Sequence, residues 1–94
     1  MMKPFRWEPE KNEQLMQERG LSFERITVAI EAGDLLQILP HQNPIRYPRQ
    51  KIMIVALEGY AYLVPFVEEE EDYFFLKTII PSRKATRDFM ASRE

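Results

Sequence analysis

The chain has 94 residues, 45% hydrophobic and 30% charged, which fits a single globular domain over residues 1–94. It has no cysteine, which excludes disulfides and thiolate metal sites, and its net charge of −2 argues against indiscriminate binding to nucleic acid. No apolar run approaches the roughly 18–20 residues of a membrane span, and the first residues are too polar for a signal peptide, so we expect a cytoplasmic protein.

Two helices are predicted in the first third of the chain. The first begins at Pro9, because proline suits the first helical turn, and it ends before Gly20. The second follows Ser22, a good N-cap residue, and ends at Gly33. Its apolar residues recur at helical spacing and form one core stripe: Phe23, Ile26, Ala29 and Ile30.

Strands and a closing helix are predicted in the rest of the chain. Residues 40–49 hold three prolines and cannot form regular structure. The predicted elements are strands over Leu35–Leu39, Lys51–Glu58, Tyr60–Glu68 and Tyr73–Ile80, a hairpin turn at Glu58 and Gly59, a bulge or unpaired edge at Pro65, an acidic turn over Glu68–Asp72, and a helix over Arg83–Arg93 capped by Ser82. This order predicts an α+β fold in which two N-terminal helices and a C-terminal helix pack on an antiparallel meander of three or four strands.

Charge alternates along the second half of the chain. Residues 41–51 carry three basic and no acidic groups, residues 52–76 six acidic and no basic groups, and residues 77–94 five basic and two acidic groups. If the fold brings the two basic segments together, they form a site for a polyanion. If it does not, the pattern is ordinary solvated surface.

Several classes of chemistry lack the residues they need. His41 is the only histidine, and its neighbours are poor ligands, so no metal site is expected. No nucleophile motif or glycine-rich phosphate loop is present, so neither nucleotide chemistry nor a cofactor is expected. RNA cleavage remains, because a ribose hydroxyl can attack its own phosphate when cations stabilise the added charge.

The segment R-K-A-T-R at Arg83–Arg87 is the main candidate for phosphate binding. Arg83 and Arg87 lie four residues apart and would share one helical face, while Ala85 and Phe89 would anchor the other face to the sheet. Lys84 lies four residues before Asp88. The alternative is an amphipathic terminal helix whose basic side is merely solvated.

The proline-rich loop carries a second group of candidates. His41, Tyr47 and Arg49 could border a binding site, since binding residues collect on loops held by a rigid scaffold. In the alternative reading Tyr47 packs on the sheet and His41 is simply exposed.

Three short motifs occur in an order that resembles the BrnT-type toxins, which are RelE-like ribonucleases of bacterial type II toxin–antitoxin systems. They are W-E-P-E-K at Trp7–Lys11, R-G-L-S-F-E at Arg19–Glu24 and R-K-A-T-R at Arg83–Arg87. The resemblance implies a RelE-like fold, metal-independent cleavage of mRNA, and a cognate antitoxin. The chain departs from the pattern at Leu15, Arg19 and Thr78, where such toxins tend to carry Asn, His and Arg.

The resemblance and the charge pattern together give a set of expected roles. Arg83 and Arg87 would bind the scissile phosphate, Lys77 or Lys84 would assist, and Lys11, Arg19 and Arg49 would extend the RNA track. His41 is the first candidate for proton transfer, ahead of Glu24 and Tyr47. On this hypothesis, Arg83→Ala abolishes growth arrest on expression while the protein stays folded.

Two other functions and one mode of association stay open. A non-catalytic relative would use the same basic face to bind an acidic helix of a partner, whereas direct DNA binding is disfavoured because the first helix pair is net acidic. The many aromatic residues of the predicted sheet either fill the monomer core or form an interface, in a homodimer or a toxin–antitoxin heterotetramer: Tyr60, Tyr62, Phe66, Tyr73 and Phe74.

Overall fold

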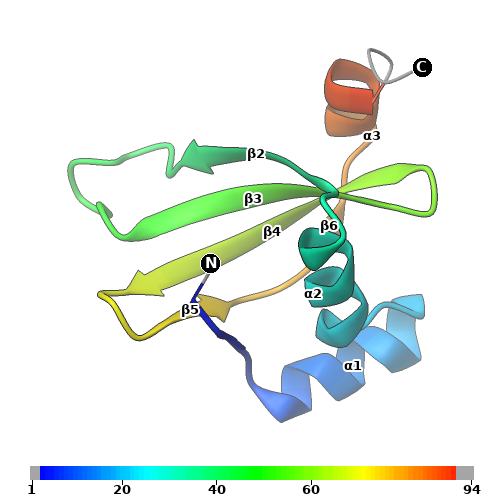
Figure 1. The fold of residues 1–94 in the computed structure, drawn as a ribbon, viewed down its shortest axis with the longest axis horizontal. Coiled ribbons are helices and arrows are strands. Elements are labelled where there is room, and N and C mark those ends of the chain that lie inside the picture. Colours follow the sequence, from blue (N-terminus) through cyan, green and yellow to red (C-terminus); the bar gives the residue numbers. More distant parts are fainter. Residues whose placement is uncertain (1–2, 91–94) are drawn as a thin grey trace.

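The computed structural model describes residues 3–90. Its strands are β1 (Phe5–Arg6), β2 (Leu35–Pro40), β3 (Gln50–Leu57), β4 (Tyr60–Glu69), β5 (Tyr73–Leu76) and β6 (Ile80–Pro81). Its helices are α1 (Pro9–Arg19), α2 (Phe23–Glu31) and α3 (Arg83–Ala85), the last continued by a π-helix over Thr86–Met90. The fold is α+β, as predicted (Figure 1).

The sheet is larger and more mixed than the predicted meander. Its strand order is β1-β5-β4-β3-β2, and β6 pairs with β4 beyond the end of β5. Strands β2 to β5 pair antiparallel with their neighbours, but β1 runs parallel to β5. The prediction of three or four antiparallel strands was therefore wrong in detail. The predicted strands correspond to the centre of the sheet, and residues 3–90 form six strands in all.

The local signals that end and begin elements act as predicted. Gly20 takes the left-handed conformation (φ 66°) that ends α1, and Ser22 Oγ accepts a hydrogen bond from the Arg25 N–H to begin α2. Glu58 and Gly59 both have positive φ (53° and 79°), the backbone of a tight hairpin turn that matches strand twist.

Two hydrophobic clusters lie on opposite faces of the sheet. Helices α1 and α2 cover one face, which we call the helical face, where Phe23 and Ile26 pack against Met53, Val64 and other buried side chains. On the opposite face, Ala85, Phe89 and Met90 pack against Ile54, Ala61 and Leu63. The predicted anchoring by Ala85 and Phe89 is thus confirmed. In Figure 1, α3 is clearly separate from α1 and α2, and none of the helices within residues 3–90 covers the end of the sheet where the β2–β3 loop turns.

A bulge interrupts the last predicted strand. Phe66 pairs with Leu76 and Leu63 pairs with Ile80, so the three residues 77–79 lie opposite only Val64 and Pro65. The prediction of one strand over Tyr73–Ile80 was wrong, because Pro65 has no N–H to continue the ladder there. A bulge or an unpaired edge was predicted at Pro65, but the extra residue lies in the facing segment 77–79, and Pro65 itself stays paired with Ile52.

The closing helix is not a regular α-helix. Only Arg83–Ala85 is α-helical, and Thr86–Met90 winds as a π-helix, so the assumption of α-helical spacing across this segment was wrong. Residues 91–94 of the predicted helix lie outside the described residues. None of the helices within residues 3–90 is long and apolar enough to span a bilayer.

The aromatic residues of the sheet do not form an exposed face. Phe66 is buried, and Tyr62 and Phe74 pack against the core of the helical face. Tyr60 lies edge-on to Tyr62, and Tyr73 lies beneath the Arg6 guanidinium. Phe66, Tyr62 and Phe74 therefore match the core alternative, whereas Tyr60 and Tyr73 are partly buried outside the core clusters.

Candidate functional site

The face of the sheet opposite α1 and α2 holds a pocket of about 300 Å³, which we call the sheet groove. It joins two catalytic candidates from distant parts of the sequence, His41 and Lys77. The remaining lining residues are Gln42, Gln50, Lys51, Ile52, Pro65 and Phe66.

The register of the strands places this groove. Ile52 and Pro65 are cross-strand partners, and they alternate with Met53, Val64 and Phe66, which are buried under the helices. The two side chains therefore point to the opposite, open face. Lys77 follows β5 and His41 follows β2, and in the strand order β5-β4-β3-β2 these two strands are three places apart. Because neighbouring strands lie about 4.8 Å apart, the backbones of the two residues are about 14 Å apart across the groove. Both side chains can reach a ligand that lies between them.

The loop that carries His41 is ordered by Asn43. The Asn43 N–H donates to His41 Nδ1 (2.9 Å), its side-chain oxygen accepts from the Arg46 N–H (3.2 Å), and its carbonyl oxygen accepts from the Tyr47 N–H (2.9 Å). The His41 and Tyr47 rings lie 4.6 Å apart. This loop therefore holds the imidazole in a defined place despite its exposed surroundings.

The contact with Asn43 fixes which ring nitrogen of His41 carries the proton. Because Nδ1 accepts a backbone hydrogen bond, the proton of the neutral ring lies on Nε2. In this tautomer the side chain is a hydrogen-bond donor toward a ligand. It has no free lone pair with which to act as a base.

Lys77 reaches the groove because of the bulge. Its N–H donates to the Pro65 carbonyl (2.8 Å), and its ammonium lies 5.9 Å from the centre of the Phe75 ring, on the open face. None of the ion pairs among residues 3–90 involves Lys77. Its charge therefore stays available to an anion.

Arg49 and Lys51 face the acidic turn and not the final helix. Arg49 lies 3.9 Å from Glu69 and 3.8 Å from Glu70, and Lys51 pairs with Glu68 at 3.1 Å. Lys3 also binds Glu68 at 2.9 Å, and these two ammonium groups, Lys3 first, hold the pKa of the Glu68 carboxyl below its usual range. The acidic side chains of Glu68, Glu69 and Glu70 therefore partly neutralise the basic charge of residues 41–51.

A smaller pocket of about 210 Å³ continues from Gln50, which lines both pockets. Its walls include Arg46, Tyr47 and Arg49, and the Arg46 guanidinium lies 5.4 Å from the Tyr47 ring centre. Arg46 thus adds a cationic group beside the sheet groove.

The described basic residues of the final helix, Arg83, Lys84 and Arg87, do not line the sheet groove. Arg83 and Arg87 are exposed, with Arg87 Nε 3.3 Å from Asp88 Oδ1. Lys84 forms the i,i+4 pair with Asp88 at 3.3 Å, and Lys84, followed by Arg87, lowers the Asp88 pKa. Among the described residues of the second basic segment, Lys77 alone joins His41 in the groove.

The candidates on α1 lie away from the groove. Arg19 ends α1 and donates to the Ile79 carbonyl at 3.1 Å, so it fixes the bulged segment between β5 and β6. Lys11 is half-buried on the same helix, on the helical face. Glu24 accepts a hydrogen bond from Asn12 on that face as well.

Sequence reasoning missed several groove residues. Gln42 and Gln50 offer amide groups, while Ile52 and Pro65 form an apolar floor. The alternation of β3 and β4 could have placed Ile52 and Pro65 on one face, but their proximity to Lys77 depends on the bulge. Within residues 3–90, no three His, Asp or Glu side chains gather in a way that could hold a metal ion.

Comparison with known proteins supplies one structural likeness. Neither a protein-family model nor a curated protein matches the sequence. The structure is similar to the crystal structure of the Brucella abortus ribonuclease toxin BrnT, with a TM-score of 0.57 and 15% identity over 87% of this chain and 97% of BrnT. The chain therefore has a BrnT-like fold.

Proposed function

We propose that this protein is a toxin-like endoribonuclease that cleaves mRNA without a metal ion, and that the sheet groove is its active site. The observation that carries the proposal is the meeting of His41 and Lys77 in one pocket on the open face of a BrnT-like fold. A cognate antitoxin, which would be a separate protein, would restrain this activity.

The chemistry needs only the RNA and the side chains of the groove. The ribose 2′-oxygen attacks the adjacent phosphorus while the bond to the 5′-oxygen breaks, which leaves a cyclic phosphate and a free 5′-hydroxyl. The Lys77 ammonium stabilises the negative charge that builds up on the phosphorane. The apolar floor of Ile52 and Pro65 supports a base or ribose beside the phosphate.

His41 acts as a hydrogen-bond donor in this scheme. In the tautomer set by Asn43, its Nε2–H keeps its proton and donates a hydrogen bond to a phosphate oxygen, which stabilises the charge of the phosphorane. No carboxylate is among the described residues that line the groove, so water takes the proton of the 2′-hydroxyl and gives a proton to the leaving 5′-oxygen. Arg46 extends the phosphate track along the loop, whereas Arg49 lies beside Glu69 and Glu70.

Expression of the chain without its antitoxin tests the proposal. We expect growth arrest with the wild-type chain and its loss with Lys77→Ala or His41→Ala. Arg25→Ala removes an exposed cation of the helical face and should leave the arrest intact. Circular dichroism of each purified variant checks that folding is unchanged. Arrest that persists in Lys77→Ala would remove the groove from the mechanism.

A second function is supported by the final helix. Its exposed Arg83 and Arg87 lie outside the groove, where they suit docking to an acidic partner. A non-catalytic relative would use this face for salt-sensitive binding. Such a protein would bind its partner and cleave no RNA at any concentration.

A further inference from the structure

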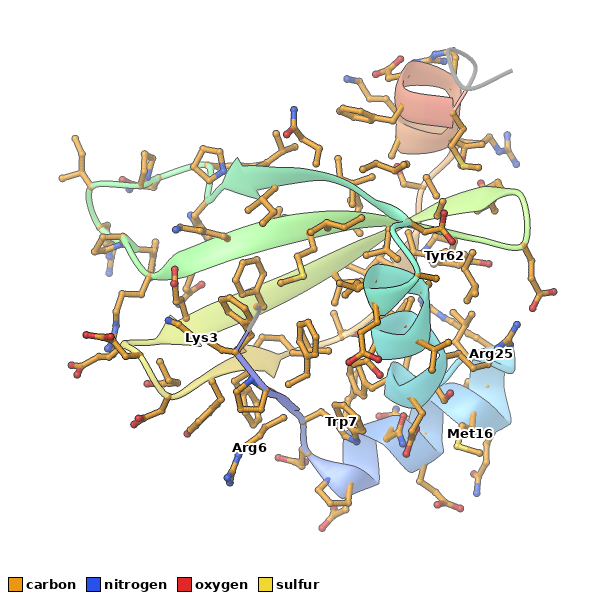
Figure 2. The ribbon with its side chains drawn as sticks, in the orientation of Figure 1. Lys3, Arg6, Trp7, Met16, Arg25 and Tyr62 are labelled. Carbon is orange, nitrogen blue, oxygen red and sulfur yellow. The ribbon has the colours of Figure 1, made fainter. Side chains whose placement is uncertain are left out.

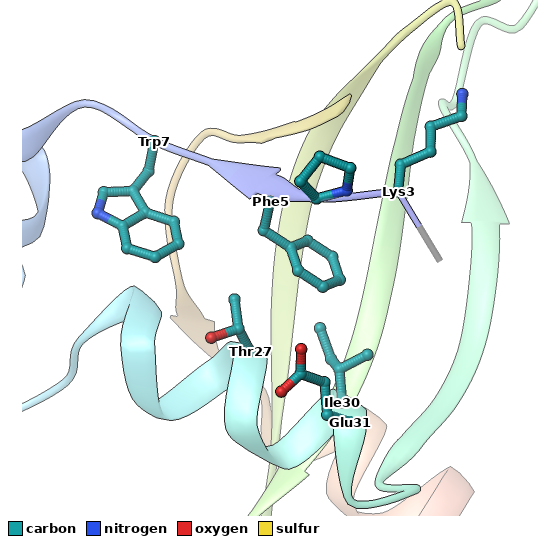
Figure 3. Close-up of a pocket in the computed structure, with 7 residues that line it drawn as sticks. Lys3, Phe5, Trp7, Thr27, Ile30 and Glu31 are labelled. Carbon is teal, nitrogen blue, oxygen red and sulfur yellow. The ribbon is translucent and has the colours of Figure 1, made fainter. Parts of the chain in front are cut away.

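A separate pocket of about 600 Å³ lies between the N-terminal strand and α2 (Figure 3). The rings of Phe5 and Trp7 form one side, Ile30 lies opposite, and Thr27 and Glu31 add polar groups from successive turns of α2. Its volume falls in the range of roughly 300–1,000 Å³ that holds a small ligand or a few side chains. The pocket lies on the helical face, away from the sheet groove.

The aromatic side of this pocket is held in place by the core. The Trp7 ring stacks on Phe23 at 5.5 Å with 23° between the planes, and the Phe5 ring lies 5.7 Å from Phe74. Phe23 is fully buried, so Trp7 rests on a rigid base. The two rings therefore present preformed π faces to the pocket.

The two polar side chains that α2 contributes to the pocket are hydrogen-bond acceptors. The Thr27 hydroxyl uses its hydrogen on the Glu24 carbonyl (2.9 Å), which leaves its oxygen lone pairs free, and the Glu31 carboxylate has only acceptors. Figure 3 shows the Glu31 carboxylate turned toward the space below the Phe5 ring, and the indole nitrogen of Trp7 on the side of its ring away from Phe5. The pocket therefore suits a ligand that is rich in donors.

The nearby cations are engaged elsewhere. Lys3, at one end of the pocket, binds Glu68 at 2.9 Å and the Glu70 carbonyl. Arg6 points away from Phe5 and Trp7, and its guanidinium lies 5.0 Å from the Tyr73 ring centre. Figure 2 shows both side chains extending away from Trp7. Among residues 3–90, no cation forms an ion pair with Glu31.

We infer that this pocket binds an arginine side chain presented by a peptide segment of a partner protein. A guanidinium has five donors and no acceptor, stacks on aromatic faces, and is neutralised by a carboxylate, which is what Phe5, Trp7 and Glu31 offer together. A single arginine side chain would fill only part of the pocket volume. The rest of the pocket accommodates the neighbouring residues of the peptide. The inference does not depend on the proposed ribonuclease activity, because the two pockets lie on opposite faces of the sheet.

Trp7 makes the test direct, because it is the only tryptophan in the chain. The probe is the blocked peptide acetyl-Gly-Leu-Arg-Gly-Leu-Arg-Gly-amide, titrated into the purified full chain while tryptophan emission is recorded, with no RNA present. We expect a saturable change in emission. The same peptide with citrulline in place of arginine keeps the shape but loses the charge, and it should bind at least about fivefold more weakly.

A variant pair locates the binding. Glu31→Gln removes the carboxylate charge from an exposed helix position and should weaken the arginine peptide at least about fivefold. Glu10→Gln, an exposed change on α1 outside the pocket, should leave the affinity as it is. Equal binding of the citrulline peptide, unchanged affinity in Glu31→Gln, or no saturable emission change with folded protein would each overturn the inference.

Discussion

Asn12 in α1 accepts a hydrogen bond of 2.8 Å from the backbone N–H of Phe23, the first residue of α2. Its amide nitrogen donates to Glu24 Oε1 at 2.8 Å, so one buried side chain joins the two helices. These contacts hold Phe23 where it supports both the core and Trp7.

Asn12→Ala is predicted to lower the free energy of unfolding by about 1–3 kcal/mol, because it leaves the buried Phe23 N–H without a partner. Urea denaturation followed by circular dichroism measures the change. Gln14→Ala removes an exposed amide from the same helix and should change stability by less than about 0.5 kcal/mol. Equal stability of both variants would contradict a role for Asn12 in joining the helices.

Thr86 attaches the final helix to the sheet. Its hydroxyl oxygen accepts from the Ala61 N–H in β4 (2.9 Å), and its hydrogen is donated to the Ser82 carbonyl (2.7 Å). Thr86→Val keeps the shape but removes both bonds, so we predict a loss of about 1–2 kcal/mol in the free energy of unfolding. Thr27→Val, where the hydroxyl bonds only its own helix, should cost clearly less in the same denaturation series. The reverse order would count against this attachment.

Glu68 makes stability depend on acidity. The pKa of its carboxyl is lowered in the folded protein by Lys3 and Lys51, so its charge stabilises the fold above the unfolded pKa of about 4.5, and the benefit is lost as pH falls through the lower folded value. Glu68→Gln should therefore lower stability at pH 7 by less than about 1 kcal/mol, since the pairs are partly exposed. The difference from the wild type should vanish in strong acid. Thermal melts at pH values from about 2 to 7 measure the difference in stability between Glu68→Gln and the wild type. A difference that persists in acid would contradict the charge pairing.

The final helix and the sheet groove make different predictions for growth arrest. If the groove is the active site, Lys77→Ala abolishes arrest while Arg83→Ala, which lies outside it, weakens RNA affinity at most. If the arginines of the helix contact the scissile phosphate, the order of the two effects reverses. Growth curves of strains expressing equal amounts of each variant distinguish these outcomes.

Local signals predicted much of the fold. Ser22, Ser82, Gly20 and the Glu58–Gly59 turn act within a few residues of themselves, so their effects can be read from adjacent sequence. The parallel pairing of β1 with β5 could not be predicted in this way, because it joins Phe5 to Phe74 across the whole chain. The packing of Phe89 and Met90, two residues of the π-helix, on the sheet is likewise a contact between distant parts of the chain.

The candidate site was predictable in its residues more than in its arrangement. His41 and Lys77 stood out by residue type, but their meeting depends on strand order and on the bulge opposite Pro65. Arg49 looked like part of the same basic surface until the β4–β5 turn placed Glu69 and Glu70 beside it. Such pairing across a sheet is not encoded in the spacing of charges along the sequence.

The most direct measurement is the initial rate at which the purified chain cleaves a labelled RNA in the presence of EDTA. The account predicts cleavage by the wild-type chain that ends in a cyclic phosphate, and a loss of at least about 100-fold in Lys77→Ala and in His41→Ala. No cleavage by the folded wild-type chain, or equal rates in the wild type and Lys77→Ala, would contradict it.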